Sequence, residues 1–373
     1  MANVLITGAK GFIGKNITLF FKQADYEVIG IDIDHTEEEL VQGLSKADFI
    51  IHLAGVNRST SNDEFKSGNV DFTKHLTEVL DTLNKSVPII VSSSTQALLD
   101  NPYGHSKKAM EDTILDWAKR TQNKVFIFRL TNVFGKWCRP NYNSAVATFC
   151  YNLAHDLPLT ITAPKKMLHL CYIDDIARCF LDIIQNASHL STGFYDVAPI
   201  LSLTLEELVQ KLTAFSQNQE TLLMPNIKDH FDKALYTTYL SYLDVPTCHY
   251  YLNGHTDARG TLNELIKSEP FGQIFISTTK PNITRGNHWH HTKTEKFVVL
   301  QGQATIALRS VLDNQVTTFD VSGDNISVID IPPGYTHCIT NTGTTDLITL
   351  FWASEIFNPE APDTYYEEVY KHE

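Results

Sequence analysis

Four residues in the last quarter of the chain have the types and spacing of metal ligands. His288 and His290 lie two apart, so both side chains would point to one face of a strand. Glu295 follows five residues later, and His337 comes after a turn sequence. Three imidazoles and a carboxylate form a nitrogen and oxygen site that suits zinc, iron, nickel or manganese. We predict that these residues bind a metal ion and expect Zn²⁺.

A second reactive pair occurs in the segment Tyr103-Gly-His-Ser-Lys107. Asn101 and Pro102 supply an N-cap and a first-turn proline, which predicts a helix that carries Tyr103 and Lys107 on one face. An ammonium beside a phenol lowers the pKa of the phenol, which makes it a proton donor for a carbonyl that receives a hydride. A hydroxyl from the serine run at 92–94, after the preceding strand, can polarise the same carbonyl.

The start of the chain has the pattern of a dinucleotide-binding turn. Gly8, Gly11 and Gly14 follow a strand-like run and open a helix-like segment. Such glycines let the backbone approach a pyrophosphate at the helix N-terminus. Asp32 ends the second predicted strand, where a carboxylate would bind a ribose 2'-hydroxyl and repel a 2'-phosphate. Because no Arg or Lys follows in that segment, the residues favour NAD(H), with Asp34 as a second candidate.

The elements that must position these residues are of two kinds. From residue 1 to about 185, short apolar runs alternate with longer amphipathic segments. This pattern predicts a doubly wound α/β fold of the Rossmann type, with a parallel sheet covered by helices on both faces. The predicted strands are 4–7, 28–31, 49–53, 89–92 and 125–130.

After residue 247, closely spaced alternating runs are separated by Gly, Thr and Asn, which is typical of an all-β barrel or sandwich. The predicted strands include 273–277, 296–300, 304–308, 327–331 and 346–352. We place the domain boundary near residue 246, which gives domains 1–246 and 247–373. Residues 186–246, with a helix at 204–212, form a small subdomain on the substrate side of the first domain.

Composition excludes several classes of function. The 373 residues carry a net charge of −13, which disfavours a nucleic-acid partner because there is no excess of Lys and Arg. No signal peptide is visible, and no apolar window is long enough to span a membrane. The six scattered cysteines form no C-x-x-C pair, so a reduced, cytoplasmic protein is expected.

Residues 1–245 resemble the extended short-chain dehydrogenase/reductase (SDR) family. The spaced glycines, His52-Leu-Ala-Gly55, the serine run, Tyr-x-x-x-Lys and Asn132-Val-Phe-Gly135 occur in the family order. The resemblance implies Tyr103 as catalytic acid, Lys107 as ribose anchor and Ser94 as carbonyl partner, with Ser92 or Ser93 as alternatives. The cofactor-binding residues that it implies are Gly8, Gly11, Phe12, Ile13, Gly14, Asp32, Leu53, Ala54, Gly55, Tyr103, Lys107 and Asn132.

Residues 250–373 resemble the cupin family, although the glycine that opens its second motif, Gly323, lies upstream of its usual place. The two-domain order resembles the CapF/WbjC/FnlB group of bacterial capsule and O-antigen enzymes, including the segments 135–144 and 280–291. This resemblance implies C3 epimerisation of a UDP-4-keto-6-deoxy-HexNAc in the cupin, then C4 reduction towards UDP-N-acetyl-L-fucosamine through a 6-deoxy-talosamine type product. It implies NADPH, whereas Asp32 favours NADH; we place NADPH first.

A 4-keto sugar serves both reactions, since its carbonyl accepts hydride at C4 and makes the C3 proton removable. Lys293 is our candidate for the epimerisation base, with Tyr335 as the alternative. For the substrate, Lys136 and Arg139 are candidate phosphate ligands and Asn141 and Asn143 candidate sugar ligands; the phosphate alternatives are Lys165, Lys166 and Arg178. A second interpretation is a single-activity reductase whose cupin serves dimerisation or sensing. A homodimer is expected in either case.

Overall fold

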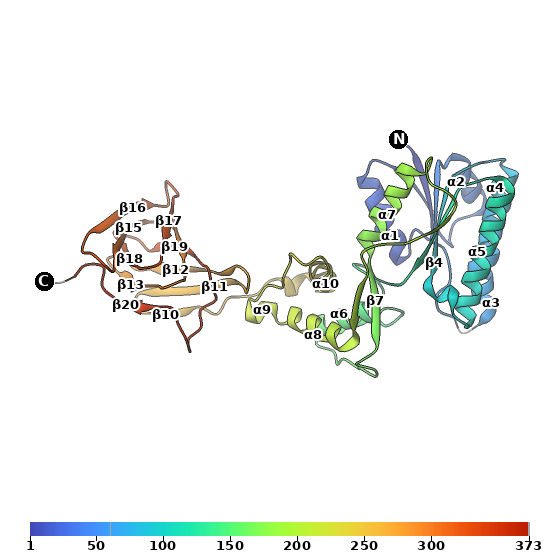
Figure 1. Ribbon diagram of the computed structural model, residues 1–373. Coiled ribbons are helices and arrows are strands. Elements are labelled where there is room, and N and C mark those ends of the chain that lie inside the picture. The colour runs from blue at the N-terminus through green and yellow to red at the C-terminus, as the bar shows by residue number, and fades with distance from the viewer. Residues whose placement is uncertain (60, 372–373) are drawn as a thin grey trace. The chain divides into compact units, whose positions relative to one another are not determined.

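A six-stranded parallel sheet forms the centre of the N-terminal part of the computed structural model, which describes residues 1–59 and 61–371 (Figure 1). The strand order is β2-β1-β3-β4-β5-β8, so the chain reverses direction across the sheet between β1 and β3. The five predicted strands are confirmed. Their bounds, with the sixth strand, are β1 Asn3–Thr7, β2 Glu27–Ile31, β3 Phe49–His52, β4 Ile89–Ser94, β5 Val125–Leu130 and β8 Gly193–Tyr195.

Helices cover both faces of this sheet (Figure 1). On one face lie α1 (Phe12–Gln23) and α7 (Ile173–Asn186); on the other lie α2 (Glu37–Lys46), α4 (Phe72–Thr82) and α5 (Pro102–Thr121). Leu5, Val91 and Ile127 from the strands pack with Met110 and Ile114 of α5 in one buried cluster. Burial on both faces explains why the strands are continuous apolar runs.

Smaller elements complete this part of the chain. A three-stranded sheet has the order β6-β7-β9. The predicted helix at 204–212 is observed as α8, which continues to Ser216. The remaining elements are α3 Asn62–Phe65, a π-helix at Lys66–Asp71, a 3-10 helix at Thr95–Leu98, β6 Asn132–Phe134, α6 Ala145–Ala154, β7 Met167–Tyr172, β9 Leu201–Thr204, α8 Leu205–Ser216, α9 Asn218–Thr221, α10 His230–Leu240 and a 3-10 helix at Val245–Cys248.

The C-terminal part consists of two mainly antiparallel sheets, as the alternating sequence predicts. One has the order β10-β11-β12-β19-β14-β17 and the other β16-β15-β18-β13-β20. Phe297, Ile306, Ile339 and Phe351 belong to the buried core of this part. The bounds are β10 His255–Asp257, β11 Gly260–Ser268, β12 Gly272–Thr279, β13 Thr284–Trp289, β14 Glu295–Gln301, β15 Gln303–Ser310, β16 Val316–Ser322, β17 Val328–Ile331, β18 Tyr335–Asn341, β19 Leu347–Ala353 and β20 Tyr365–Tyr366.

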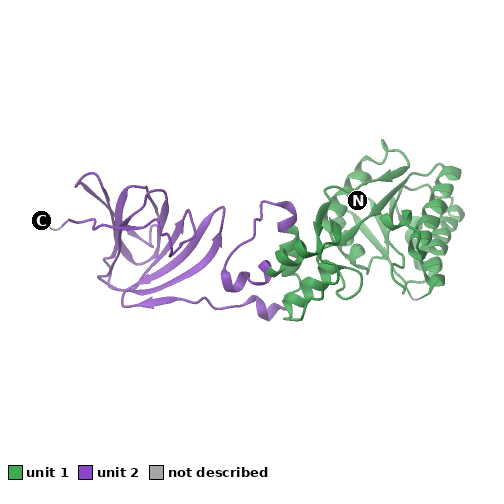
Figure 2. Cartoon of the chain, turned by 60° about the horizontal axis from the view of Figure 1, so that its bottom comes forward, with its two compact units in different colours: residues 1–213, 234–243 green, residues 214–233, 244–373 purple. Residues whose placement is uncertain are grey.

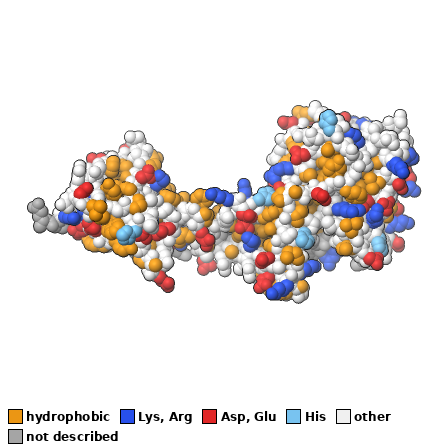
Figure 3. All heavy atoms as spheres, viewed as in Figure 1, with side chains coloured by type: hydrophobic (Ala, Val, Ile, Leu, Met, Phe, Trp, Pro, Cys, Tyr) orange, Lys and Arg blue, Asp and Glu red, His pale blue; other side chains and the backbone are white. Residues whose placement is uncertain are grey.

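The chain divides into two units (Figure 2). Unit 1 comprises residues 1–213 and 234–243, and unit 2 comprises residues 214–233 and 244–373. On the face shown in Figure 3, acidic and basic side chains are interspersed over the surface of each unit. Within the described residues, none of the helices combines the length and apolar character that a membrane span requires.

Candidate active site and metal centre

A cavity of about 630 Å³ in unit 1 joins the glycine turn to the predicted catalytic residues. The carboxyl ends of β1, β4 and β5 meet there, as expected for a parallel sheet of this order. Ser94, Tyr103 and Lys107 line the cavity. So do six further residues of the predicted cofactor set: Gly11, Phe12, Ile13, Leu53, Gly55 and Asn132. The remaining four, Gly8, Gly14, Ala54 and Asp32, lie outside the lining.

The glycine turn has the shape that a dinucleotide requires. Gly8 has a φ of +69°, and a Cβ on it would lie 2.9 Å from the backbone nitrogen of Ala54. A Cβ on Gly14 would lie 2.1 Å from the carbonyl oxygen of Gly8. Helix α1 has no side-chain cap at Gly11, so its first N–H groups are left for a ligand. These residues fit the pyrophosphate of a dinucleotide.

Helix α5 begins as predicted. Asn101 is its N-cap and accepts a hydrogen bond from the backbone N–H of Gly104 at 2.8 Å, and Pro102 occupies the first turn. A Cβ on Gly104 would lie 2.3 Å from the carbonyl oxygen of Gln96. Gly104 therefore lets the first turn of α5, with Tyr103, pack against the segment that follows the serine run. Sequence reasoning did not assign this glycine a role.

The structure distinguishes the three serines. Ser93 donates to the fully buried carboxylate of Glu111 at 2.6 Å. Ser92 donates to a backbone carbonyl of β3 at 3.3 Å. Only Ser94 of the three lies close enough to the phenol of Tyr103 to lower its pKa. This geometry favours Ser94 as the residue that meets a substrate carbonyl together with Tyr103.

Burial dominates the protonation of Tyr103 and Lys107. Burial raises the pKa of Tyr103, and the nearby Ser94 hydroxyl only partly opposes that effect. Burial lowers the pKa of Lys107 to about 8, although Glu111 opposes this. The ammonium of Lys107 donates to the backbone carbonyl of Ser92 at 3.0 Å. The Tyr103 pKa is therefore raised rather than lowered as expected, because desolvation disfavours the phenolate.

The adenosine end of the turn contains a cation that sequence reasoning missed. The backbone N–H of Lys10 donates to Asp32 at 2.7 Å, and the ammonium of Lys10 pairs with Asp34. Lys10 also lines the cavity. The segment after β2 carries no cation of its own, but Lys10 from the glycine turn lies beside Asp32 and Asp34. The inference that no cation is available at this end of the site is therefore wrong.

Two of the predicted substrate ligands, Arg139 and Asn143, line the same cavity. Lys136 instead pairs with Asp174 at 3.1 Å, and Arg178 pairs with Asp175 at 2.7 Å. The predicted substrate ligands outside the cavity lining are Lys136, Asn141, Lys165, Lys166 and Arg178.

The four predicted metal ligands converge in unit 2. His288 lies on β13, His290 just after it, Glu295 at the start of β14 and His337 on β18, and one ligand atom from each lies within 4.8 Å of the others. The expectation that both histidines lie on one regular strand is not met, because the register of β13 with β18 shifts between Gly286 and His288. Both histidines nevertheless join the cluster.

The cluster has the donor chemistry of a metal site. Nε2 of His290 and of His337 and Oε2 of Glu295 are buried, and these atoms have no hydrogen-bond partner among the described residues. Oε2 of Glu295 approaches the two nitrogens at 3.3 and 3.2 Å. Burial, followed by neighbouring His337, lowers the pKa of His288 to about 4, so this imidazole is neutral and able to ligate. The residues fit a divalent cation such as zinc.

The C-terminal segment orients one of these ligands. Nδ1 of His290 donates to the backbone carbonyl of Asp363 at 2.5 Å, which places the ring proton on Nδ1 and leaves Nε2 for the cluster. The Asp363 carboxylate accepts from the backbone N–H groups of His291, Thr292 and Lys293 at 2.9, 2.8 and 2.9 Å. These bonds lower the pKa of Asp363 even though burial opposes them. No sequence motif linked Asp363 to the cluster.

Lys293, the predicted base, is buried beside this turn. Its ammonium donates to the hydroxyl of Thr364 at 3.1 Å. Its charge is close enough to contribute to the lowered pKa of His288. The alternative, Tyr335, is 40% exposed, which is less suited to a base in a dry site.

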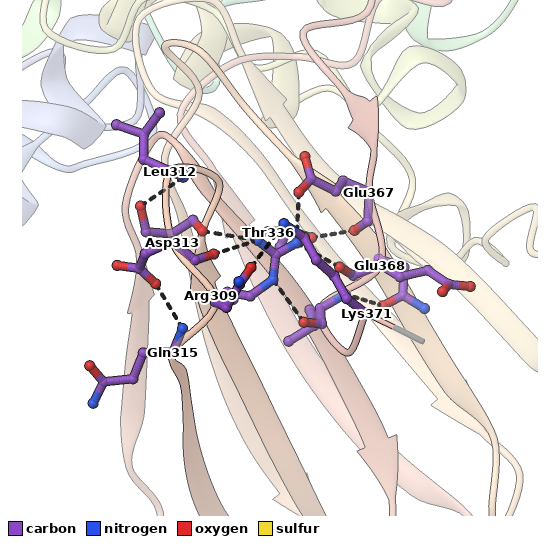
Figure 4. Close-up of polar contacts among 12 residues, drawn as sticks. Arg309, Leu312, Asp313, Gln315, Thr336, Glu367, Glu368 and Lys371 are labelled. Atoms are coloured by element: carbon purple, nitrogen blue, oxygen red, sulfur yellow. Dashed lines mark hydrogen bonds and ion pairs between the residues drawn. The ribbon is translucent and has the colours of Figure 1, made fainter. Parts of the chain in front are cut away.

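Arg309 holds the end of the same segment (Figure 4). Its side chain is 1% exposed and pairs with the Glu367 carboxylate at 2.6 Å. It also donates to four backbone carbonyls, those of Ser310, Asp313, Glu368 and Val369. A buried guanidinium with so many acceptors is a stable anchor. The segment that carries Asp363 is therefore fixed from β15.

Asp363→Ala removes the carboxylate that holds the backbone N–H groups of 291–293, so the Asp363 carbonyl that orients His290 is no longer fixed in place. We predict that this lowers the affinity for Zn²⁺ by about 10- to 100-fold, as loss of a group that supports a ligand does in other metal sites. The measurement is competition with a chromophoric chelator. Asp330→Ala is the matched control, since this exposed carboxylate pairs with Lys296 on the surface. Unchanged zinc affinity in a folded Asp363→Ala protein would contradict a positioning role.

The parallel sheet, the glycine turn and the Ser94-Tyr103-Lys107 group define an SDR-type domain in unit 1, joined to an all-β domain. Residues 4–198 match the NAD dependent epimerase/dehydratase family, and residues 255–365 match the polysaccharide biosynthesis C-terminal domain. The chain is 39% identical to UDP-2-acetamido-2,6-beta-L-arabino-hexul-4-ose reductase of Pseudomonas aeruginosa, over 97% of each chain.

Solved structures agree with this match. The structure of the capsular polysaccharide assembling protein CapF from Staphylococcus aureus is 43% identical with a TM-score of 0.90, and the match covers 98% of this chain and 100% of that one. UDP-N-acetylglucosamine 4-epimerase from Bacillus cereus shares only the fold, at 21% identity and a TM-score of 0.54 over 64% of this chain and 96% of that one. The chain belongs to the CapF family of two-domain polysaccharide biosynthesis enzymes.

Proposed function

We propose that the chain is a bifunctional enzyme of capsule or O-antigen biosynthesis that acts on a UDP-4-keto-6-deoxy-HexNAc. Unit 2, in this proposal, is a cupin that inverts C3, and unit 1 then reduces C4 on the path to UDP-N-acetyl-L-fucosamine. The observation that carries the proposal is a pair of residue groups in different units: Ser94, Tyr103 and Lys107 on one cavity with the glycine turn, and a cluster of three histidines and a glutamate. The name of the Pseudomonas relative, a hexul-4-ose reductase, supports a 4-keto substrate.

The geometry of unit 1 supports the proposed reduction. A dihydronicotinamide held in this cavity would supply the hydride for C4 of the sugar. Tyr103 gives its phenolic proton to O4, and its raised pKa keeps that proton in place until reaction. In this proposal Ser94 donates a hydrogen bond to O4 beside Tyr103, and Lys107, which lines the same cavity, binds the ribose of the cofactor. The C4 ketone thus gains one hydride at carbon and one proton at oxygen and becomes the alcohol.

The epimerisation uses the acidity of C3 next to the C4 carbonyl. A metal held by His288, His290, Glu295 and His337 would supply Lewis-acid stabilisation of negative charge on O4. Lys293 is the proposed base, as a buried amine beside the cluster. Lys293 would take up the C3 proton, and a proton from solvent, delivered to the opposite face, would invert the centre. We further propose that the enzyme works in the cytoplasm as a homodimer.

We propose NADPH as the preferred cofactor, with Lys10 as the cation for the 2'-phosphate. Lys10→Ala should then raise the KM for NADPH by about tenfold, the loss of one charge-assisted contact, and leave the KM for NADH nearly unchanged. Initial rates with each cofactor give the answer. Lys22→Ala, at the far end of α1, is the control. An equal effect on both cofactors would contradict this role of Lys10.

The reductase should lose activity as the pH rises through about 8. Burial sets the pKa of Lys107 near that value, below its usual 10.5, so its ammonium is present below pH 8 and is lost above it. A pH profile of kcat/KM in the direction of reduction reports this free-enzyme group. Lys107→Arg, which stays charged, should remove the alkaline fall. A fall that persists unchanged in this variant would assign it to another group.

The second candidate function is a single-activity reductase whose all-β domain binds metal without catalysis. Incubation of the full chain with the UDP-4-keto sugar in heavy water, without nicotinamide cofactor, separates the two. The bifunctional proposal predicts deuterium at C3 of the recovered substrate. No incorporation by the zinc-loaded protein would leave only the reductase.

A further inference from the structure

A second cavity, of about 220 Å³, lies beside the metal-binding cluster in unit 2. His288 and Glu295 form part of its wall, and Phe275, Phe297 and Phe351 give it an apolar side. Its volume is below the range of about 300–1,000 Å³ for pockets that enclose a drug-sized ligand. It therefore has room for part of a large ligand. Three polar residues on its wall, Arg259, Arg285 and Ser277, have no place in the chemistry described so far.

The two arginines on this wall differ in their partners. Arg259 pairs with the Asp257 carboxylate at 2.5 Å. Arg285 donates to the Thr279 hydroxyl at 2.9 Å and to the Thr278 carbonyl at 3.2 Å, and within the described residues no carboxylate lies at ion-pair distance from it. Burial, followed by the charge of Arg259, lowers the pKa of Arg285. The other carboxylate on this wall, Glu295, faces His290 and His337 in the metal-binding cluster. The Arg285 guanidinium is therefore the group on this wall that is left for an anion.

Ser277 supplies an independent observation. Its side chain is 2% exposed, and its hydroxyl has no hydrogen-bond partner among the described residues. An unpaired buried hydroxyl costs about 1–3 kcal/mol, so such groups are normally satisfied. Because Ser277 lines the same cavity as Arg285, one anionic ligand can accept hydrogen bonds from both.

We propose that Arg285 and Ser277 bind the diphosphate of the nucleotide-linked sugar and thereby present its pyranose ring to the metal cluster. This inference rests on the proposed epimerisation and names the residues that hold its substrate. The diphosphate carries its charge before reaction, so it matches a permanent guanidinium better than a ketone whose charge develops only in the transition state. The nucleoside then extends beyond the small cavity.

Hydrogen exchange read by mass spectrometry tests the inference in the full-length, zinc-loaded protein, because it reports each unit separately. We expect UDP to protect peptides of β12 and β13, and uridine not to protect them. Arg285→Gln should weaken the protection by UDP at least about tenfold in apparent Kd, the loss of one charge-assisted contact, and Ser277→Ala should weaken it less. Protection in the loop 136–144 of unit 1 should persist in both variants.

Lys296→Gln is the matched control, since it removes an exposed cation of the same unit that pairs with Asp330 outside the cavity. Equal protection by UDP and uridine would overturn the inference, as would full protection by UDP in a folded Arg285→Gln protein. If deuterium enters C3 of the substrate but UDP leaves β12 and β13 unprotected, the inference fails and the epimerisation stands. If UDP protects these strands and no deuterium enters C3, the diphosphate site stands and the epimerisation fails.

Discussion

Tyr103→Phe is expected to lower the rate of C4 reduction by about 10²- to 10⁴-fold, the usual contribution of a positioned general acid. The variant removes one oxygen from a side chain that lines the cavity of unit 1 together with Ser94. The ring remains, and its contact with Phe65 at a centroid distance of 5.8 Å is kept, so the fold and cofactor binding should survive. Only the proton for O4 is lost.

The measurement is single-turnover oxidation of NADPH by the UDP-4-keto sugar, with cofactor affinity determined separately by fluorescence. Tyr26→Phe is a suitable control, because Tyr26 contacts Phe21 at the far end of α1, away from the cavity. Deuterium exchange at C3 should be unchanged in Tyr103→Phe. If the variant reduced the sugar at the normal rate, the proton would come from another group and the assignment of Tyr103 would be wrong.

His337→Gln is expected to have the opposite pattern: loss of bound zinc and a fall in C3 exchange of at least about 100-fold, with reduction of an already epimerised substrate unchanged. His337 is fully buried, and its unpartnered Nε2 faces Glu295 at 3.2 Å. Three remaining ligands bind a divalent cation more weakly than four, and a glutamine oxygen is a poorer zinc ligand than imidazole.

Elemental analysis and C3 exchange together test this expectation. His291→Gln is the control, since His291 is exposed, packs against Trp289 and Tyr365, and lies outside the cluster. Lys293→Met should keep the metal and lose the exchange, which would separate the base from the ligands. Full C3 exchange in zinc-free His337→Gln would show that the cluster has no part in the epimerisation.

Together these two variants would show whether the reactions are independent. Each blocks one step and spares the other, because the two groups of residues belong to different units of the chain. Mixing the two inactive proteins should restore product formation from the 4-keto substrate if the intermediate dissociates between the steps.

Local sequence determined most of the architecture. The pattern of apolar residues depends on which faces are buried, so the parallel strands and the later all-β part were predictable from short segments of sequence. The start of α5 was predictable from the N-cap Asn101 and the proline that follows it. The sequence also identified the four residues that come together in the metal-binding cluster, because few residue types can serve as metal ligands. The glycine turn was readable for a similar reason, since only glycine fits at Gly8 and Gly14.

Tertiary structure decided which chemically equivalent residues lie together. Ser94 differs from Ser92 and Ser93 only in its partners, and those partners come from other elements. Lys10 approaches Asp34 across 24 positions, and Asp363 reaches His290 across 73. Such contacts depend on strand order, register and bulges, which no local pattern records. The residue types and their periodicity thus belong to the sequence, whereas their pairing, burial and protonation arise only when distant segments pack and exclude water.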